Sequence, residues 1–495
     1  MIHFDNVVAR LRRTRPTTRF RRVTAARRSG RSQEPAVRCL ALWCTLAISL
    51  GAGAASGAPR LEKPELKIGF IKLTDCAPLV VAYEKGFFED EGLYVTLEAQ
   101  ANWKIVLDRV IDGSLDAAHM LPGQVIGANA GIGAKAELVA VAAMGLNTLA
   151  ITVSNPVWQA MQPGLPTQAG RVVHPIGAAS LKPIIASYTN AGRRFTMGMV
   201  FPTSTHNYAL RYWLAAGGIH PGFYTPTDSN GATGGTVQLS VTPPPQMPAT
   251  LGAGTIFGFS VGEPWNQQAV LKGLGTTVVT ADQIWSRVPE KVLGLRGDFV
   301  ARNPHTVQAL VRAIIRAEQW LDANNGANRK ELAKLLARPE YVGADYNVLL
   351  GPLTGQYQFA KGDVRPAPDT NRYFRDFAGY PFPGDAVWYL TQMRRWGQIG
   401  TKQPDTWYDA IARKAYRGDI YRAAAATLIA SGKLAAADVP ALEAFGAPAG
   451  KFIDGVSFDP GHPNAYLEKF AIGQQSGTSA KPTNDKAPAR KVATP

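Results

Sequence analysis

The chain has 495 residues, of which 46% are hydrophobic and 18% charged, and this composition fits a globular protein of two or three domains. Its formal net charge is +16, but residues 1–58 hold 11 Arg, no Lys and two acidic residues, so that only +7 is spread over the remainder. That distribution argues against nucleic-acid binding and is compatible with the attraction of small anions.

Residues 1–58 are predicted to be a cleaved export leader. An Arg-rich stretch at 10–38 precedes an apolar run at 39–50, and small residues follow that run. A charged region, an apolar region and an A-x-A-like site in this order are typical of a secretory signal. The apolar run is short for a membrane span, although an uncleaved anchor is the alternative. Paired arginines at 21–22 and 27–28 are compatible with twin-arginine export into the periplasm.

After removal of the leader, a single cysteine remains. Cys39 and Cys44 lie in the leader, which leaves Cys76 and excludes an internal disulfide or a thiol-rich metal site. We expect Cys76 to be a buried, inert residue at a helix start rather than a nucleophile.

From residue 66 onward, short apolar strands alternate with helices. The expected strands are 66–71, 94–99, 115–121, 149–154, 196–201, 237–242, 255–261 and 276–281. The expected helices are 77–85, 103–111, 137–142, 206–217, 307–324 and 329–336. This alternation predicts doubly wound parallel α/β sheets, in which ligands bind beyond the carboxyl ends of the strands. Residues 155–182 are expected to be loop-rich, and the polar tail at 474–495 is expected to be disordered.

The stretch FPTSTHNYALRYWLAAGG at 201–218 is the most informative feature of the chain. Ser and Thr favour helix starts and Gly favours helix ends, so Thr205 and His206 are placed at a helix N-terminus. Such a terminus offers backbone N–H groups and a positive dipole to an anion, and His206 adds a further donor. The alternative is an ordinary capped helix with a surface histidine.

Other polar and aromatic residues fall at strand-to-helix junctions. They are Thr74, Asp75, Asn102, Trp103, His119, Asn147, Glu263 and Trp265. Two lobes with such junctions facing each other would form a clamp for a small anion. Local roles are the alternative, with Asp75 and Glu263 as helix caps and the tryptophans as packing residues.

Several enzyme motifs are missing from the sequence. It contains no G-x-S-x-G elbow, no G-x-x-x-x-G-K-[ST] phosphate loop, no H-E-x-x-H and no paired-cysteine zinc pattern. We therefore do not expect an enzyme, a resident metal or a cofactor.

Long segments of the chain resemble the nitrate/bicarbonate-type substrate-binding proteins of ABC transporters. They are LTDCAPLVVAYEKGFF (73–88), LDAAHML (115–121), FPTSTHNYALRYWLAAGGI (201–219), VTPPPQMPATL (241–251), VGEPWNQQAV (261–270), PEKVLG (289–294) and YLTQMRRWGQI (389–399). The resemblance implies a type II periplasmic-binding-protein fold. Residues 59–154 and 290–473 would form lobe 1, residues 155–289 would form lobe 2, and the crossings would lie near Ser154 and Glu290.

In that family the oxyanion lies beneath a Trp and near a His, and the resemblance assigns these roles to Trp103 and His206. Thr74, Thr205 and Asn147 are expected to add polar contacts. The sequence departs from the family at Leu149, which cannot donate a hydrogen bond where a polar residue is common.

Glu263 is expected to lie near the ligand, where a carboxylate is unfavourable beside a buried anion. It could act as a cap, pair with protonated His206, or hold a cation that bridges to the ligand. The bicarbonate branch of the family is associated with calcium, which gives the third role a model.

The sequence thus predicts an exported, monomeric solute-binding protein that captures nitrate or nitrite and delivers it to the permease and ATPase subunits of an ABC transporter. Alternatives are a bicarbonate-binding protein that uses calcium as co-ligand, an anion sensor of the same fold, and an enzyme, because related folds occur in thiamine-pyrimidine biosynthesis.

Overall fold

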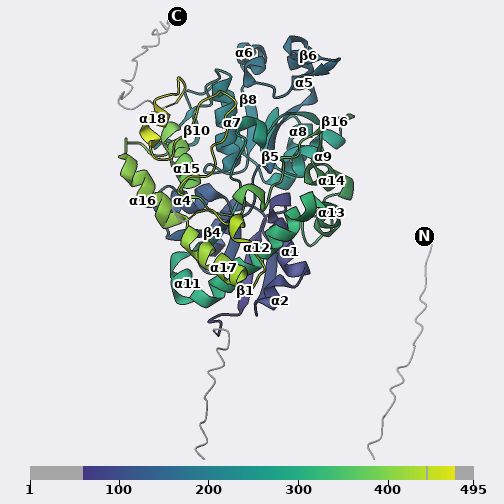
Figure 1. Ribbon diagram of the computed structural model, residues 1–495. Coiled ribbons are helices and arrows are strands. Elements are labelled where there is room, and N and C mark those ends of the chain that lie inside the picture. Colours follow the sequence, from purple (N-terminus) through teal and green to yellow (C-terminus); the bar gives the residue numbers. More distant parts are fainter. Residues whose placement is uncertain (1–59, 442–443, 474–495) are drawn as a thin grey trace, which may run out of the picture. The chain divides into compact units, whose positions relative to one another are not determined.

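Two five-stranded sheets organise residues 60–441 and 444–473, which are the residues that the computed structural model describes (Figure 1). The expected leader at 1–58 and the expected tail at 474–495 lie outside them. The first sheet has the order β2 (Tyr94–Ala99), β1 (Glu65–Phe70), β3 (Ala117–Met120), β14 (Val292–Arg296) and β4 (Leu138–Ala143). The second has the order β11 (Val237–Val241), β8 (Phe195–Met199), β12 (Gly258–Gly262), β5 (Leu149–Ser154) and β13 (Gly275–Thr280).

Each sheet contains one strand that runs against its neighbours. Strand β14 is antiparallel to β3 and β4, and β5 is antiparallel to β12 and β13. These are also the two strands that the chain enters after it passes from one sheet to the other. The first passage lies between Ala143 and Leu149, and the second lies between Thr280 and Val292. The result is two α/β lobes joined by two crossings.

Two expectations from the sequence are wrong. The first crossing was expected near Ser154, but β5 is hydrogen-bonded within the second sheet, so the crossing precedes Leu149. The segment expected as a helix at 137–142 is strand β4 (Leu138–Ala143). All six residues of β4 are buried, and an apolar run buried on both faces has no periodicity that separates a strand from a helix.

Helices from distant parts of the sequence pack on the first sheet. They are α1 (Ala77–Glu84), α2 (Phe87–Asp90), α3 (Trp103–Ile111), α4 (Pro122–Ala130), α11 (Gly297–Arg302), α12 (Pro304–Gly326) and α17 (Gly418–Ala430). The late helix α17 contacts both α12 and β4, so early and late segments lie side by side (Figure 1). The described residues all belong to one compact unit of the chain.

The second sheet has its own set of helices. They are α5 (Asn155–Met161), α6 (Lys182–Asn190), α7 (Thr205–Ala216), α8 (Met247–Gly252), α9 (Trp265–Leu271) and α10 (Ala281–Ile284). The remaining main elements are α13 (Arg329–Leu336), α14 (Tyr346–Thr354), α15 (Pro383–Arg395), α16 (Asp405–Ala415), α18 (Pro463–Leu467) and the hairpins β6 (Thr167–Gln168)–β7 (Arg171–Val172), β9 (Phe223–Thr225)–β10 (Asp228–Thr233) and β15 (Gln356–Ala360)–β16 (Asp363–Pro366). Within the described ranges, no helix is both long and apolar enough to cross a bilayer.

Candidate functional site

A set of charged and polar side chains is buried where the strand ends of the two sheets meet. It comprises Asp75, Trp103, His119, Thr148, His206, Glu290 and Lys291, here called the polar cluster. Asp75, Trp103 and His119 come from the carboxyl ends of first-sheet strands, and His206 follows the second-sheet strand β8. Thr148, Glu290 and Lys291 lie on the two crossings, so the cluster draws on both lobes and on the segments between them.

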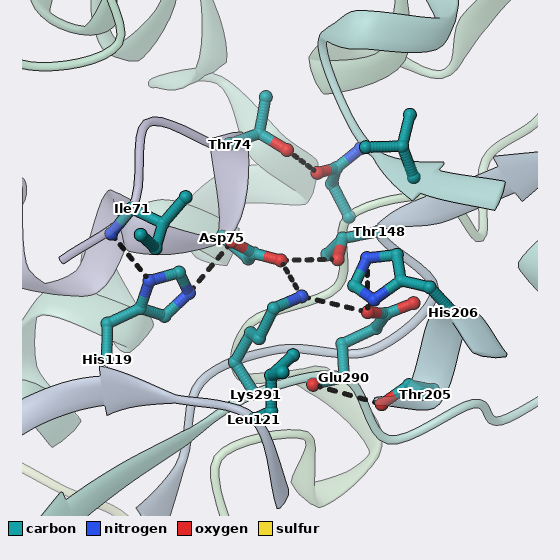
Figure 2. A network of polar contacts seen from close by, with 12 residues as sticks. Ile71, Thr74, Asp75, His119, Leu121, Thr148, Thr205, His206, Glu290 and Lys291 are labelled. Carbon is teal, nitrogen blue, oxygen red and sulfur yellow. Dashed lines mark hydrogen bonds and ion pairs between the residues drawn. The ribbon is translucent and has the colours of Figure 1, made fainter. Parts of the chain in front are cut away.

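Lys291 is at the centre of the polar cluster (Figure 2). Its ammonium donates to Asp75 Oδ2 at 2.6 Å and to Glu290 Oε2 at 3.0 Å, and its side chain is fully buried. It also lies 5.6 Å from the centre of the Trp103 ring, within the range of a cation–π contact. Burial opposes the charged form of Lys291, but the two carboxylates outweigh burial and raise its pKa. Lys291 is therefore a permanent positive charge inside the protein.

Asp75 is the permanent negative partner of Lys291. Its Oδ2 also accepts from the Thr148 hydroxyl at 2.8 Å, and its Oδ1 lies 2.8 Å from His119 Nε2. Burial acts to raise the pKa of Asp75, but Lys291 and His119 together hold it below its usual range. His119 Nδ1 accepts from the Ile71 amide at 3.4 Å, so Nε2 carries the hydrogen that faces Asp75.

Two aromatic side chains bring polar atoms without protein partners into the polar cluster. Both ring nitrogens of His206 and the indole Nε1 of Trp103 are buried and make no hydrogen bond. Their positions are fixed by helix caps: the Asn102 side chain accepts from Ile105 N at 3.0 Å at the start of α3, and Ser204 caps α7. Buried polar atoms without partners are costly, so these groups indicate a binding site for a small polar ligand.

Glu290 differs from Asp75 in having only one strong contact. Its Oε2 accepts from Lys291 and lies 3.9 Å from His206 Nε2, while Oε1 is buried without a partner. Burial, reinforced by the Asp75 charge, raises the pKa of Glu290 to about 7, although Lys291 and the nearby Leu149 backbone amide oppose this shift. Burial and the Lys291 charge hold the pKa of His206 well below its ordinary value, so the imidazole is neutral.

Charge and donor geometry together make the polar cluster suited to an anion. Lys291, the Trp103 indole N–H and the His206 ring are donors or potential donors within the polar cluster, and all three side chains are buried. Charge-assisted hydrogen bonds from such groups are strong in a site that excludes water. Over the described ranges, no group of three or more His, Cys, Asp or Glu side chains is arranged to hold a metal ion.

The residues singled out from the sequence fall into two groups. Trp103 and His206 are members of the polar cluster, and Thr205 adjoins it. The Thr205 hydroxyl lies 2.5 Å from the Tyr389 hydroxyl and 3.3 Å from the Glu290 carbonyl oxygen, so it ties α7 to the second crossing.

Thr74, Asn147 and Glu263 are engaged with other protein groups. Thr74 donates its hydroxyl to Asn371, and the Asn147 side chain holds the backbone of residues 286, 288 and 369. Asn147 also has a φ of 58°, a left-handed conformation that Asn tolerates.

The carboxylate of Glu263 accepts from the Tyr357 hydroxyl and from the Gln267 amide, the latter at 3.3 Å. Burial raises its pKa to about 7. Of the three roles considered for Glu263, these contacts match the helix cap.

Lys291 and Glu290 were not expected in the site. Their signal in the sequence is the charged pair in PEKVLG, which directly precedes an apolar strand at a crossing. Charged residues rarely precede a fully buried strand without a buried partner, so the pair could have indicated an internal ion pair.

A donor cluster closed between two α/β lobes defines a substrate-binding protein of the periplasmic-binding type. The sequence over residues 59–337 matches the NMT1-like family. The chain belongs to this family and, within it, to the nitrate/bicarbonate-type substrate-binding proteins of ABC transporters.

Relatives with known roles support this assignment. A nitrate/nitrite binding protein NrtA of Nostoc sp. is 32% identical over 426 residues, which is 84% of this chain and 88% of that protein. A bicarbonate-binding protein CmpA of Synechococcus elongatus is 30% identical over 435 residues, 84% of this chain and 89% of the relative. A nitrate import ATP-binding protein NrtC of Synechocystis sp. is 36% identical over 423 residues, but the chain spans only 57% of its length.

A solved structure confirms the fold. The crystal structure of the periplasmic nitrate-binding protein NrtA from Synechocystis superimposes with a TM-score of 0.72 and 30% identity, and covers 84% of this chain and 100% of that chain. The expected type II fold with two α/β lobes is thereby confirmed, as is the family resemblance.

Proposed function

We propose that this protein is the binding component of an ABC importer and captures nitrate or nitrite in the polar cluster. The observation that carries the proposal is the buried Lys291 ammonium beside unpartnered polar atoms of Trp103 and His206. Nitrate is flat, singly charged and only an acceptor of hydrogen bonds, so these groups match its oxygens. The naming of the relatives as nitrate/nitrite binding proteins points the same way.

Bicarbonate with calcium is the second candidate, because a bicarbonate-binding protein is among the relatives. A calcium ion would need carboxylate oxygens free to coordinate it. In the polar cluster, the Lys291 ammonium already lies between the Asp75 and Glu290 carboxylates, at 2.6 Å and 3.0 Å. An ammonium there takes the place that a cation would need. The carboxylate oxygen of Glu290 that has no partner, Oε1, is far short of the about six to eight oxygens that calcium binds, which favours nitrate over a calcium-dependent ligand.

Capture is proposed to close the two lobes around the ion by a hinge motion. Contacts between the lobes are present at the strand ends: the Thr74 amide donates to the Glu263 carbonyl at 2.8 Å, and Trp265 Nε1 donates to the Lys72 carbonyl at 2.9 Å. These bonds link the loop after β1 with the loop after β12, so they would form and break as the lobes close and open.

The proposed partners are a permease and an ATPase, to which a monomeric, exported protein would deliver its ligand. Export rests on the leader expected at residues 1–58. An anion sensor of the same fold would use the same site with a different partner. A catalytic role is not proposed, because the one cysteine in the described ranges, Cys76, is fully buried and burial raises its thiol pKa.

Isothermal titration calorimetry of the purified protein tests the proposal. Nitrate, nitrite and bicarbonate are each titrated, the last with and without calcium. The expected result is saturable heat with nitrate or nitrite and none with bicarbonate in either condition. Tight calcium-dependent bicarbonate binding without nitrate heat would overturn the assignment.

A further inference from the structure

Glu290 has a free carboxylate oxygen next to the proposed ligand groups. Its Oε2 is held by Lys291 at 3.0 Å and lies 3.9 Å from His206 Nε2 (Figure 2). Its Oε1 makes no hydrogen bond, and the side chain is fully buried. Both ring nitrogens of His206 are also unpartnered, and Figure 2 shows this ring beside the Glu290 carboxyl, so the unpartnered atoms of the two residues belong to one site.

The charged groups around Glu290 do not compensate the charge of an ionised Glu290 together with that of a bound anion. The ionisable groups that face it from the packed elements are Asp75, His206, Lys291 and Tyr389, and His119 lies behind Asp75, in contact with its Oδ1. Asp75 and Lys291 neutralise each other, and both histidines have lowered pKa values and are neutral. An ionised Glu290 beside a captured monovalent anion would therefore place two uncompensated negative charges in a buried site, which is strongly unfavourable.

We propose that Glu290 is a further ligand residue of the anion site and binds a proton from solvent when the anion enters, so that its carboxylic acid donates a hydrogen bond to the anion. This inference rests on the proposed function. It makes capture of the anion dependent on pH, with one proton taken up for each anion bound.

Glu290 is a better proton acceptor than its neighbours. Burial raises the pKa of Glu290 to about 7, whereas His206 titrates well below its ordinary value and Asp75 is held ionised. A bound anion raises the pKa of Glu290 further, so the complex is protonated where the free protein is ionised. The affinity for the anion is then highest below about pH 7 and decreases as pH rises. For one linked proton, the decrease is about thirtyfold from pH 6 to pH 8.5.

Calorimetry with sodium nitrate measures this proton directly. Titrations of the full chain at pH 6, 7, 8 and 8.5, each in two buffers of different protonation enthalpy, give the number of protons bound with the anion. The wild-type protein is expected to take up close to one proton at pH 8 and few at pH 6. Glu290→Gln keeps the shape and a donor but cannot titrate, so its affinity is expected to stay constant over this range with no proton uptake.

Glu263→Gln is the matched control. Glu263 is also buried with a pKa raised to about 7, but its carboxylate is bonded to Tyr357 and Gln267, so the variant should keep the wild-type proton uptake. Nitrate binding without proton uptake in the wild type overturns this inference alone, and so does a proton still taken up by Glu290→Gln. Absence of nitrate heat at every pH overturns the proposed function and this inference with it.

Discussion

Removal of the Lys291 ammonium should destabilise the folded protein strongly at neutral pH. In Lys291→Met, the Asp75 and Glu290 carboxylates lose a cation at 2.6 Å and 3.0 Å while they remain buried. Breaking a buried ion pair from one side costs about 3–5 kcal/mol. We expect the lower end, about 3 kcal/mol, because Glu290 can take up a proton near pH 7 and Asp75 keeps its contacts with His119 and Thr148.

The stability that Lys291→Met loses should be larger at neutral pH than at acidic pH. In the wild type, Lys291 helps to hold the pKa of Asp75 below its value in an unfolded chain, so this stabilisation is present at neutral pH and is lost only as pH falls through the folded pKa. Without Lys291, burial raises the pKa of both carboxyls above their unfolded values. The penalty is then largest at pH 7.5 and shrinks as pH falls towards 5, where the carboxyls become neutral.

Urea unfolding followed by tryptophan fluorescence measures the effect, since the chain contains ten Trp. The matched control is Lys104→Met, which removes an ion pair of the same length, 2.6 Å to Asp108, from the surface. That variant is expected to lose less than about 1 kcal/mol. The reasoning is refuted if Lys291→Met loses no more than this control, or if its loss does not change between pH 7.5 and pH 5.

Two further substitutions test ligand capture by calorimetry with nitrate. His206→Ala should weaken binding by about 1–3 kcal/mol, because a partner of the anion is removed, whereas His462→Ala on the surface should not; equal affinities would remove His206 from the site. A Cβ on Gly123 would lie 1.8 Å from the Thr203 carbonyl oxygen of the other lobe, so Gly123→Ala should block closure and lower affinity at least tenfold. Gly127→Ala in the same helix, where the nearest atom is 3.5 Å away, should bind as the wild type does, and the same affinity in both variants would contradict the closure model.

Local sequence signals were sufficient for much of the fold. Helix α3 (Trp103–Ile111) and helix α13 (Arg329–Leu336) have the predicted bounds, because caps and apolar spacing define such helices locally. Strand β4 (Leu138–Ala143) was mistaken for a helix because its burial on both faces removes the alternation. The position of the first crossing depends on the partners of β5 (Leu149–Ser154), which are β12 and β13, far along the chain, and which leave no local signal.

The difference between local signals and long-range contacts also explains which site residues could be predicted from the sequence. The caps before Trp103 and His206 are local features, and both residues lie in the polar cluster. Lys291 and Asp75 are 216 residues apart, and only the folded chain brings them to 2.6 Å. Glu263 was expected beside the ligand, but its partner Tyr357 comes from a later hairpin that the sequence did not associate with it.

A crystal structure of the protein with nitrate tests the central claim most directly. The account predicts an anion between the two lobes, with its oxygens within hydrogen-bond distance of Lys291 Nζ, Trp103 Nε1 and His206. It also predicts the Glu290 carboxyl in contact with the anion. A nitrate bound elsewhere, with Trp103 Nε1 and the His206 ring nitrogens still unpartnered, would contradict the account.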